Sequence, residues 1–196
     1  ILYTTELNQL AGHAWFEKGN YEKALPYLEK YVNSSAKVKR EDLYELASCY
    51  YHQKQYAKAI EGFKPLSSGQ DSLTQHAMYL LGDAYLQTND KANARTAFIF
   101  CAGNSSNPAI RESSIFHAGK LAHDLGLDNE AIIALKQYLA TYPTGRFKAE
   151  GQDLLVAALA NTSNYREALQ LYESLPAQTA TNRKLLPKLL YNMAQE

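Results

Sequence analysis

An alanine recurs along the chain at a nearly constant interval, and this interval constrains the fold more than any other feature of the sequence. Successive copies are separated by 35, 35, 37 and 37 residues, and they are Ala24, Ala59, Ala94, Ala131 and Ala168. A fixed period of this length is typical of chains in which one supersecondary unit is copied and each copy packs against its neighbours. The sequence therefore predicts a linear array of repeats.

The stretch 81–98, LGDAYLQTNDKANARTAF, shows the repeated pattern most completely. Its interior positions, together with a bulky residue just before it, are occupied by Met78, Leu81, Gly82, Tyr85, Ala94 and Phe98. This pattern resembles the tetratricopeptide repeat. The resemblance covers nearly the whole chain. It implies an all-α fold, a right-handed superhelical α-solenoid of about five helix–turn–helix repeats followed by a C-terminal partial repeat.

The recurring positions divide the chain into units. We expect residues 1–196 to form a single array with repeats at about 5–38, 40–70, 75–106, 108–143 and 145–177, and a partial repeat at 183–196. Gly19 and Asn20 suit the turn inside the first repeat, and Asn107 followed by Pro108 suits the start of a helix. Because the chain starts at Ile1 and stops within the pattern, we expect it to be a segment of a longer protein.

Composition excludes two classes of function. The chain has 20 basic and 20 acidic residues and a formal net charge of zero, which lacks the positive excess of a nucleic-acid-binding protein. Its longest apolar run, residues 154–160, is far shorter than the roughly 20 residues that cross a bilayer. We therefore expect protein or peptide partners, no nucleic acid and no direct membrane span.

No recognisable catalytic or metal-binding motif occurs in the sequence. The chain lacks a glycine-rich phosphate loop, a nucleophile elbow and an HExxH segment, and its histidines lack the spacing of zinc ligands. Cys49 and Cys101 are expected to be small buried apolar residues. We therefore predict a non-enzymatic protein without a cofactor, a metal or catalytic residues.

In tetratricopeptide arrays the first helix of each pair lines the concave surface, and the resemblance places a binding groove there. The residues predicted to line this partner-binding groove are Phe16, Tyr44, Tyr51, His52, Tyr79, Asp83, Phe116, His117, Lys120 and His123. Aromatic side chains are enriched in binding hot spots, so these rings favour capture of an extended peptide or a helix. The alternative is that some of these rings pack against the next helix pair.

The charge of the groove indicates what it does not bind. One family role, a clamp for the carboxylate terminus of cytosolic chaperones, requires Lys or Arg and Asn at defined first-helix positions. The matching positions hold Gln9, His13, Tyr44, Ser48, Tyr79 and Asp83, and none is basic. Acidic residues at positions 17, 41, 45 and 83 indicate instead a partner with some positive charge.

The segment Tyr142-Pro143-Thr144-Gly145-Arg146-Phe147 resembles a link between repeats in bacterial cell-envelope proteins. These are the lipoprotein of the outer-membrane barrel-assembly machine and the Tol–Pal coordinator. The resemblance implies a scaffold in a bacterial cell-envelope assembly, in the periplasm or at the outer membrane, with the cytoplasm as the alternative. A second hypothesis is a structural spacer or self-association module, motivated by the apolar C-terminal helix around residues 186–190.

Overall fold

The computed structural model describes residues 2–177 and 179–195, and every regular element in these ranges is a helix. The elements are α1 (Leu2–Glu17), α2 (Tyr21–Ser34), α3 (Arg40–His52), α4 (Tyr56–Phe63), the short 3₁₀ helix η1 (Lys64–Leu66), α5 (Ser72–Gln87), α6 (Lys91–Gly103), α7 (Pro108–Asp124), α8 (Asp128–Thr141), α9 (Lys148–Asn161), α10 (Tyr165–Ser174) and α11 (Ala180–Met193). The predicted all-α helical-repeat fold is confirmed, with five helix pairs followed by one C-terminal helix in the described part of the chain. The chain divides into two compact units, one ending at Ile110 and the other beginning at Arg111.

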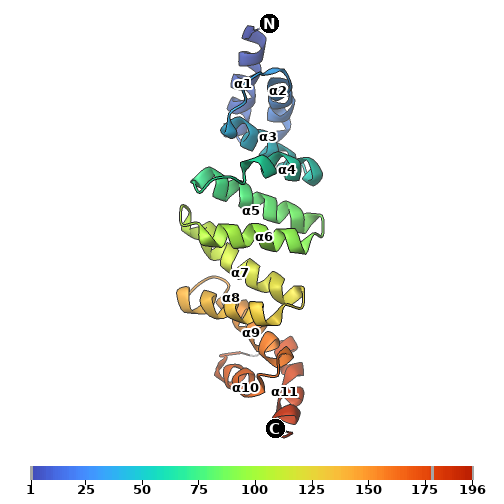
Figure 1. Cartoon of the computed structure of the whole chain (residues 1–196), viewed down its shortest axis with the longest axis vertical. Helices are drawn as coiled ribbons and strands as arrows, with labels where there is room; N and C mark the ends of the chain where they lie inside the picture. Colours follow the sequence, from blue (N-terminus) through green and yellow to red (C-terminus); the bar gives the residue numbers. More distant parts are fainter. Residues whose placement is uncertain (1, 178, 196) are drawn as a thin grey trace. The chain divides into compact units, whose positions relative to one another are not determined.

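The first unit is built from the helix pairs α1–α2, α3–α4 and α5–α6 (Figure 1). The two helices of each pair pack against each other, and successive pairs meet where α2 contacts α3 and α4 contacts α5. The first helices also contact one another, α1 with α3 and α3 with α5. This stacking is a consequence of the repeat, because one amphipathic pair cannot bury its apolar side alone.

Small residues let the helices approach closely. The five recurring alanines, on which the repeat was predicted, are all fully buried. Gly12 shows how close the approach is, since a Cβ atom added there would lie 2.7 Å from Cγ of Leu28 on α2. A larger side chain at Gly12 would therefore force α1 and α2 apart.

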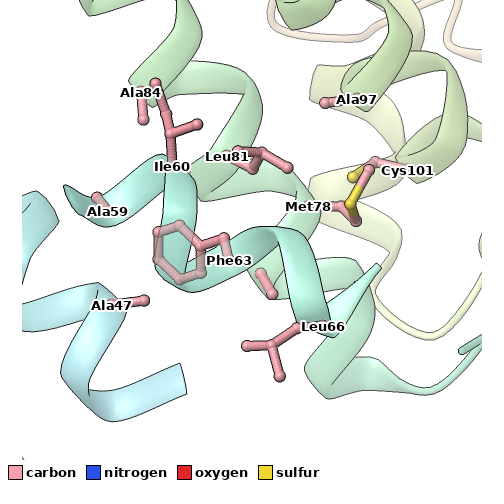
Figure 2. Packing of buried hydrophobic residues seen from close by; sticks show 11 residues of the cluster. Ala47, Ala59, Ile60, Phe63, Leu66, Met78, Leu81, Ala84, Ala97 and Cys101 are labelled. Carbon is pink, nitrogen blue, oxygen red and sulfur yellow. The ribbon is translucent and has the colours of Figure 1, made fainter. Parts of the chain in front are cut away.

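One apolar cluster joins the second and third pairs. Figure 2 shows Ile60 of α4 beside Leu81 of α5, and Met78 of α5 beside Cys101 of α6. Phe63 of α4 and Leu66 of η1 belong to the same buried cluster. The side chains of Phe63 and Leu66 are at most 1% exposed. Burial of this kind is worth about 1.5–3 kcal/mol for each large apolar side chain, so the cluster fixes the contact between α4 and α5.

The turn inside each helix pair has the same backbone conformation. A residue with positive φ ends the first helix of every pair, and these residues are Gly19, Lys54, Asn89, Gly126 and Ser163. Each lies five positions before the buried alanine of its repeat. The next backbone N–H then bonds back into the first helix, as from Asn20 to the carbonyl of Trp15 at 2.9 Å. This is the hydrogen bond of a Schellman-type helix end.

The second unit continues the pattern with α7–α8, α9–α10 and α11. Gly119 of α7 faces α8, because a Cβ atom there would lie 3.2 Å from Ala134 and Leu135. α9 contacts α8, α10 and α11. The last helix is anchored by the fully buried Leu189 and by a hydrogen bond of 2.6 Å from Nδ2 of Asn182 to Asp153 on α9.

Candidate functional site

The first helix of each pair carries a row of polar and aromatic side chains, and we call these rows the first-helix face. In the first unit the face belongs to α1, α3 and α5. Hydrogen bonds link these helices at a separation close to one repeat. Nε2 of Gln9 on α1 donates to Oδ1 of Asp42 on α3 at 2.8 Å, and Nδ1 of His13 lies 2.7 Å from Oε1 of Glu45.

Asp42 and Glu45 lie one turn apart on α3, and both carboxylates are almost fully buried, at 7% and 8% exposed. Asp42 is well supplied with neutral donors, since its Oδ2 accepts from the Tyr31 hydroxyl at 3.0 Å and from the backbone N–H of Lys39 at 3.1 Å. Glu45 is not, because its Oε2 atom is buried without a hydrogen-bond partner in the part of the chain that the structure describes. Such a group carries a desolvation cost that a donor would remove.

The pKa values of Glu45 and His13 are both shifted from their ordinary values. Burial raises the pKa of the Glu45 carboxyl, the contact with His13 opposes that shift, and the charges of Asp42 and Glu17 add to it. The hydrogen bond and the charge of Glu45 raise the pKa of His13. His13 is thus the residue whose positive charge, when protonated, compensates the carboxylate of Glu45, although the His13 side chain is 55% exposed.

A cavity of about 410 Å³ lies between α1 and α3 at the same place. It is lined by Gln9, Leu10, His13, Lys39, Glu41, Asp42 and Glu45. Its volume falls within the 300–1,000 Å³ typical of ligand pockets. The first-helix face of the first unit is therefore hollowed where its two buried carboxylates lie.

Aromatic rings of the first unit cluster at the contact between its first two helix pairs. The ring of Phe16 lies 6.4 Å from Tyr44 and 5.6 Å from Tyr21, in edge-to-face arrangements. His52 stacks on Tyr21 with ring centroids 3.8 Å apart. Phe16 and Tyr44 remain half-buried and His52 is exposed. These three predicted groove residues therefore pack at the contact between the first two pairs and still reach the surface.

The remaining predicted residues of the first unit lie between the second and third pairs. The Tyr51 hydroxyl donates to Oδ2 of Asp83 on α5 at 2.5 Å. Burial, followed by this hydrogen bond and the Asp83 charge, raises the pKa of Tyr51. Tyr79 lies edge-to-face on Phe98 of α6, with centroids 5.6 Å apart. Tyr51, Asp83 and Tyr79 are half-buried, and their part in binding stays a prediction.

In the second unit the structure corrects one prediction. Phe116 is 1% exposed and does not present its ring to a groove. The physical reason is Phe147, from the link between α8 and α9, which stacks on Phe116 with centroids 4.3 Å apart. Tyr138 of α8 covers another side of the Phe116 ring at 5.6 Å. Phe116 is a packing residue.

The other three predicted residues of the second unit have polar partners within that unit. Nδ1 of His117 lies 2.7 Å from the carbonyl oxygen of Ser113, and burial lowers the pKa of His117. Nζ of Lys120 donates to Glu150 on α9 at 2.6 Å. Nδ1 of His123 lies 2.5 Å from Oδ1 of Asp128 at the start of α8. Each is half-buried, and their part in binding stays a prediction.

Sequence reasoning missed Leu10, Lys39 and Asp42 among the residues that line the cavity. The signal was present in the spacing, because Gln9 and Asp42 are 33 residues apart and His13 and Glu45 are 32 apart, close to one repeat. A polar residue paired with another one repeat later predicts a hydrogen bond between successive first helices. Burial of the carboxylates carries no such signal.

Other kinds of site find no support in the described ranges, 2–177 and 179–195. No cluster of three or more His, Cys, Asp or Glu side chains there is arranged to hold a metal ion. Cys49 and Cys101 are fully buried, as predicted, and burial raises the pKa of the Cys49 thiol to about 12. None of the described helices is both long and apolar enough to traverse a bilayer.

Comparisons with known proteins agree with this architecture. The family model described as anaphase-promoting complex, cyclosome, subunit 3 matches residues 17–101, which is less than half of the chain. No curated protein matches the sequence.

Several solved structures share the fold. A crystal structure of MamA has a TM-score of 0.67 at 19% identity, with 97% of each chain covered. MamA of AMB-1 has a TM-score of 0.71 at 18% identity and covers 94% of this chain and 93% of its own. A putative kinesin light chain of Podospora anserina with TPR-like repeats has a TM-score of 0.59 at 18% identity, covering 94% and 97%.

The chain has a tetratricopeptide-like helical-repeat fold. The family match and the structural likenesses support this fold and leave the partner open.

Proposed function

We propose that this chain is a protein-interaction module that binds a segment of a partner protein, a peptide or a helix, along the first-helix face of its first unit. The observation that carries the proposal is the cavity of about 410 Å³ between α1 and α3, lined by side chains of that face. Helical-repeat arrays use extended surfaces of this kind for recognition. No catalytic step belongs to the proposal.

Two aromatic residues, Phe16 on α1 and Tyr44 on α3, support binding along the same two helices. Phe16 and Tyr44 are half-buried, so their rings are fixed by packing while part of each stays available. A ring held in this way loses little conformational entropy on binding and serves as an anchor. A partner segment would then contact rings and cavity together.

A peptide-library selection on the immobilised chain tests the proposal. Leu10, which is 64% exposed at the cavity, is changed to Ala in one variant. The matched control is Ile99→Ala, which truncates an exposed apolar residue of a second helix, α6. We expect Leu10→Ala to weaken the selected peptides several-fold, since one or two buried methylene groups are worth about 1–2 kcal/mol.

Three outcomes of that selection contradict the proposal. The first is that no peptide binds. The second is that the selected peptides bind Leu10→Ala and the parent equally. The third is that Ile99→Ala, and not Leu10→Ala, loses binding, which would place recognition on the second helices.

The alternative function is self-association through the C-terminal helix. Leu190 and Tyr191 on α11 are 51% and 67% exposed, whereas Leu189 beside them is fully buried. Two large exposed apolar side chains in sequence favour a contact with a second copy or with a flanking segment. Sedimentation of the parent and of Tyr191→Glu over a hundredfold range of concentration tests this function, and a monomer throughout would contradict it.

We propose that the protein is located in the bacterial cell envelope, with the cytoplasm as the alternative. The support is the resemblance of segment 142–147 to the links of envelope repeat proteins. This segment connects α8 to α9 and includes Phe147, which covers Phe116. Fractionation of the parent organism with an antibody against the chain tests the location, and recovery in the cytoplasmic fraction alone would contradict it.

A further inference from the structure

We propose that the cavity between α1 and α3 receives a cationic side chain of the partner, an arginine, whose guanidinium group binds Glu45. This inference rests on the proposed function and deepens it, because it names the chemistry that the partner segment must carry. It also gives a role to a carboxylate that packing alone does not explain.

The first observation is the unsatisfied atom. Glu45 lines the cavity and is 8% exposed, and its Oε2 atom has no hydrogen-bond partner in the described part of the chain. Its other oxygen is already in contact with His13. A buried carboxylate oxygen without a donor is costly, and a donor that carries positive charge would compensate for both the missing hydrogen bond and the desolvated charge.

The second observation is the balance of charge. Three carboxylates, of Glu41, Asp42 and Glu45, line the cavity against two basic side chains, Lys39 and His13. Asp42 accepts hydrogen bonds from neutral donors, the Gln9 amide, the Tyr31 hydroxyl and the Lys39 backbone N–H. A cation is therefore attracted to the cavity and an anion is repelled.

The third observation is the shape of the lining. Leu10 is 64% exposed and lies beside the carboxylates. An arginine has an apolar stem and a charged end, so its methylene groups fit against Leu10 while its guanidinium reaches Glu45. A guanidinium offers five donors in a fixed plane and is weakly hydrated, which makes arginine the better match for a nearly buried carboxylate.

A bare metal ion is a poorer occupant. The described residues include no group of three His, Cys, Asp or Glu side chains placed around one point. A divalent ion with two ligands would remain mostly hydrated. An organic cation attached to a peptide needs only one carboxylate and an apolar wall, and the cavity has both.

The test uses the whole chain and two short probes. The first probe is the pentapeptide acetyl-Ala-Ala-Arg-Ala-Ala-amide, and the second replaces its arginine by citrulline, which has nearly the same shape but no charge. Titrations are followed by the backbone amide signals of the ¹⁵N-labelled chain. We expect the arginine probe to shift signals of α1 and α3 around Leu10 and Glu45. We expect the affinity of the citrulline probe to be lower by a factor of about ten or more.

A pair of matched variants assigns the binding group. Glu45→Gln keeps the shape and removes the charge, and we expect it to lose the preference for arginine. The control is Glu61→Gln, which changes an exposed residue of α4 that does not line the cavity and should bind the probe as the parent does. Should Glu45→Gln fail to fold, Glu41→Gln at the exposed rim is expected to weaken the arginine probe two- to threefold, about 0.4–0.7 kcal/mol.

Equal binding of the two probes, or shifts confined to other helices, would overturn the inference. Unchanged affinity of the arginine probe for Glu45→Gln would do the same. The proposed function would survive these results if the peptide selection still returned ligands that depend on Leu10. Conversely, an empty selection would contradict the proposed function whatever the two probes do.

Discussion

Tyr44 in the first unit and Phe116 in the second hold the same place in their repeats, three residues before a buried small residue of the first helix, Ala47 or Gly119. Their surroundings differ. Tyr44 is half-buried and contacts Phe16 at 6.4 Å, whereas Phe116 is closed in by the stacked ring of Phe147.

The difference comes from the links between helix pairs. The link between α8 and α9 delivers Phe147 onto the face. The equivalent link after the α3–α4 pair, residues 67–71, carries no aromatic residue. Two positions with the same register on a first helix can therefore be half-buried in one unit and core in the other.

The same contrast holds for charge. Glu45 in the first unit is nearly buried and has one unpartnered oxygen. In the second unit Lys120 and Glu150 form an ion pair in which each side chain is about half exposed, at 40% and 47%. The first arrangement leaves a buried acceptor without a donor, and the second is satisfied within the chain.

The largest expected effect concerns the two aromatic positions. Phe116→Ala should lower the free energy of unfolding by about 3–5 kcal/mol, because it removes a fully buried ring. Tyr44→Ala should cost only about 1–2 kcal/mol, because that ring is half-buried. Urea unfolding followed by far-UV circular dichroism measures both, and equal losses would remove the contrast between the units.

The next effect compares two helical glycines. Gly12→Ala would place a Cβ atom 2.7 Å from Leu28, and we expect a loss of about 1–3 kcal/mol. Gly151→Ala on α9 would place it 3.5 Å from Tyr138, an ordinary contact, and should stabilise the chain by up to about 1 kcal/mol through helix propensity. Melting of the two variants tests the signs, which should be opposite.

The inter-helix turns allow a finer comparison. Lys54 has a φ of 58° and Gly126 a φ of 75° at equivalent places in their repeats. Lys54→Gly should stabilise the chain by about 0.5–1 kcal/mol, since glycine accepts this conformation without strain. Gly126→Ala should destabilise it by a similar amount. A loss of stability in Lys54→Gly would show that this lysine contributes more than its backbone conformation costs.

The exposed ion pair of the second unit should matter little. Lys120→Ala is expected to change the free energy of unfolding by less than about 1 kcal/mol, because both partners are close to half exposed. It should also leave the binding of the arginine probe unchanged. Thermal melting and the probe titration check the two statements, and a large loss in either would contradict the assignment of Lys120 to ordinary surface packing.

The smallest expected effect is a change in how stability depends on pH. Glu45 raises the pKa of His13 above its ordinary value of 6.5, and Glu17 and Asp42 add to this. The stabilising contribution of His13 is therefore complete below about pH 6.5 and is lost as pH rises through the raised pKa. His13→Gln should destabilise the chain more at about pH 5.5 than at about pH 8.

His117 in the second unit should show the opposite dependence. Burial lowers its pKa, and the charges of Lys120 and Arg146 act in the same direction while Glu150 opposes them. Its contribution is present at high pH and is lost as pH falls below about 6.5. His117→Gln should therefore destabilise the chain less at about pH 5.5 than at about pH 8. Melting temperatures of the parent and both variants at the two pH values test this dependence. If the destabilisation by His13→Gln and by His117→Gln changed in the same direction between the two pH values, this assignment would be wrong.

The sequence by itself determined the repeat, the helix pairs and the residues that cap several of them. The interval between alanines predicted helix pairs, and all five alanines are fully buried in them. Two capping residues were also predicted from the sequence. The side chain of Asn20 accepts a hydrogen bond from the backbone N–H of Lys23, and that of Asn107 accepts one from the backbone N–H of Ile110. These features are local or recur at a fixed interval, so the same residue types have the same role in every copy.

Only the tertiary structure decided which outward positions are open. Phe116 and Tyr44 cannot be told apart by register, because the residue that covers Phe116 comes from a link about one repeat away. Likewise nothing in the local sequence distinguishes the nearly buried Glu45 from the exposed Glu41 on the same helix. Exposure depends on which neighbouring helix and link lie over a position, and that is set by how successive copies stack.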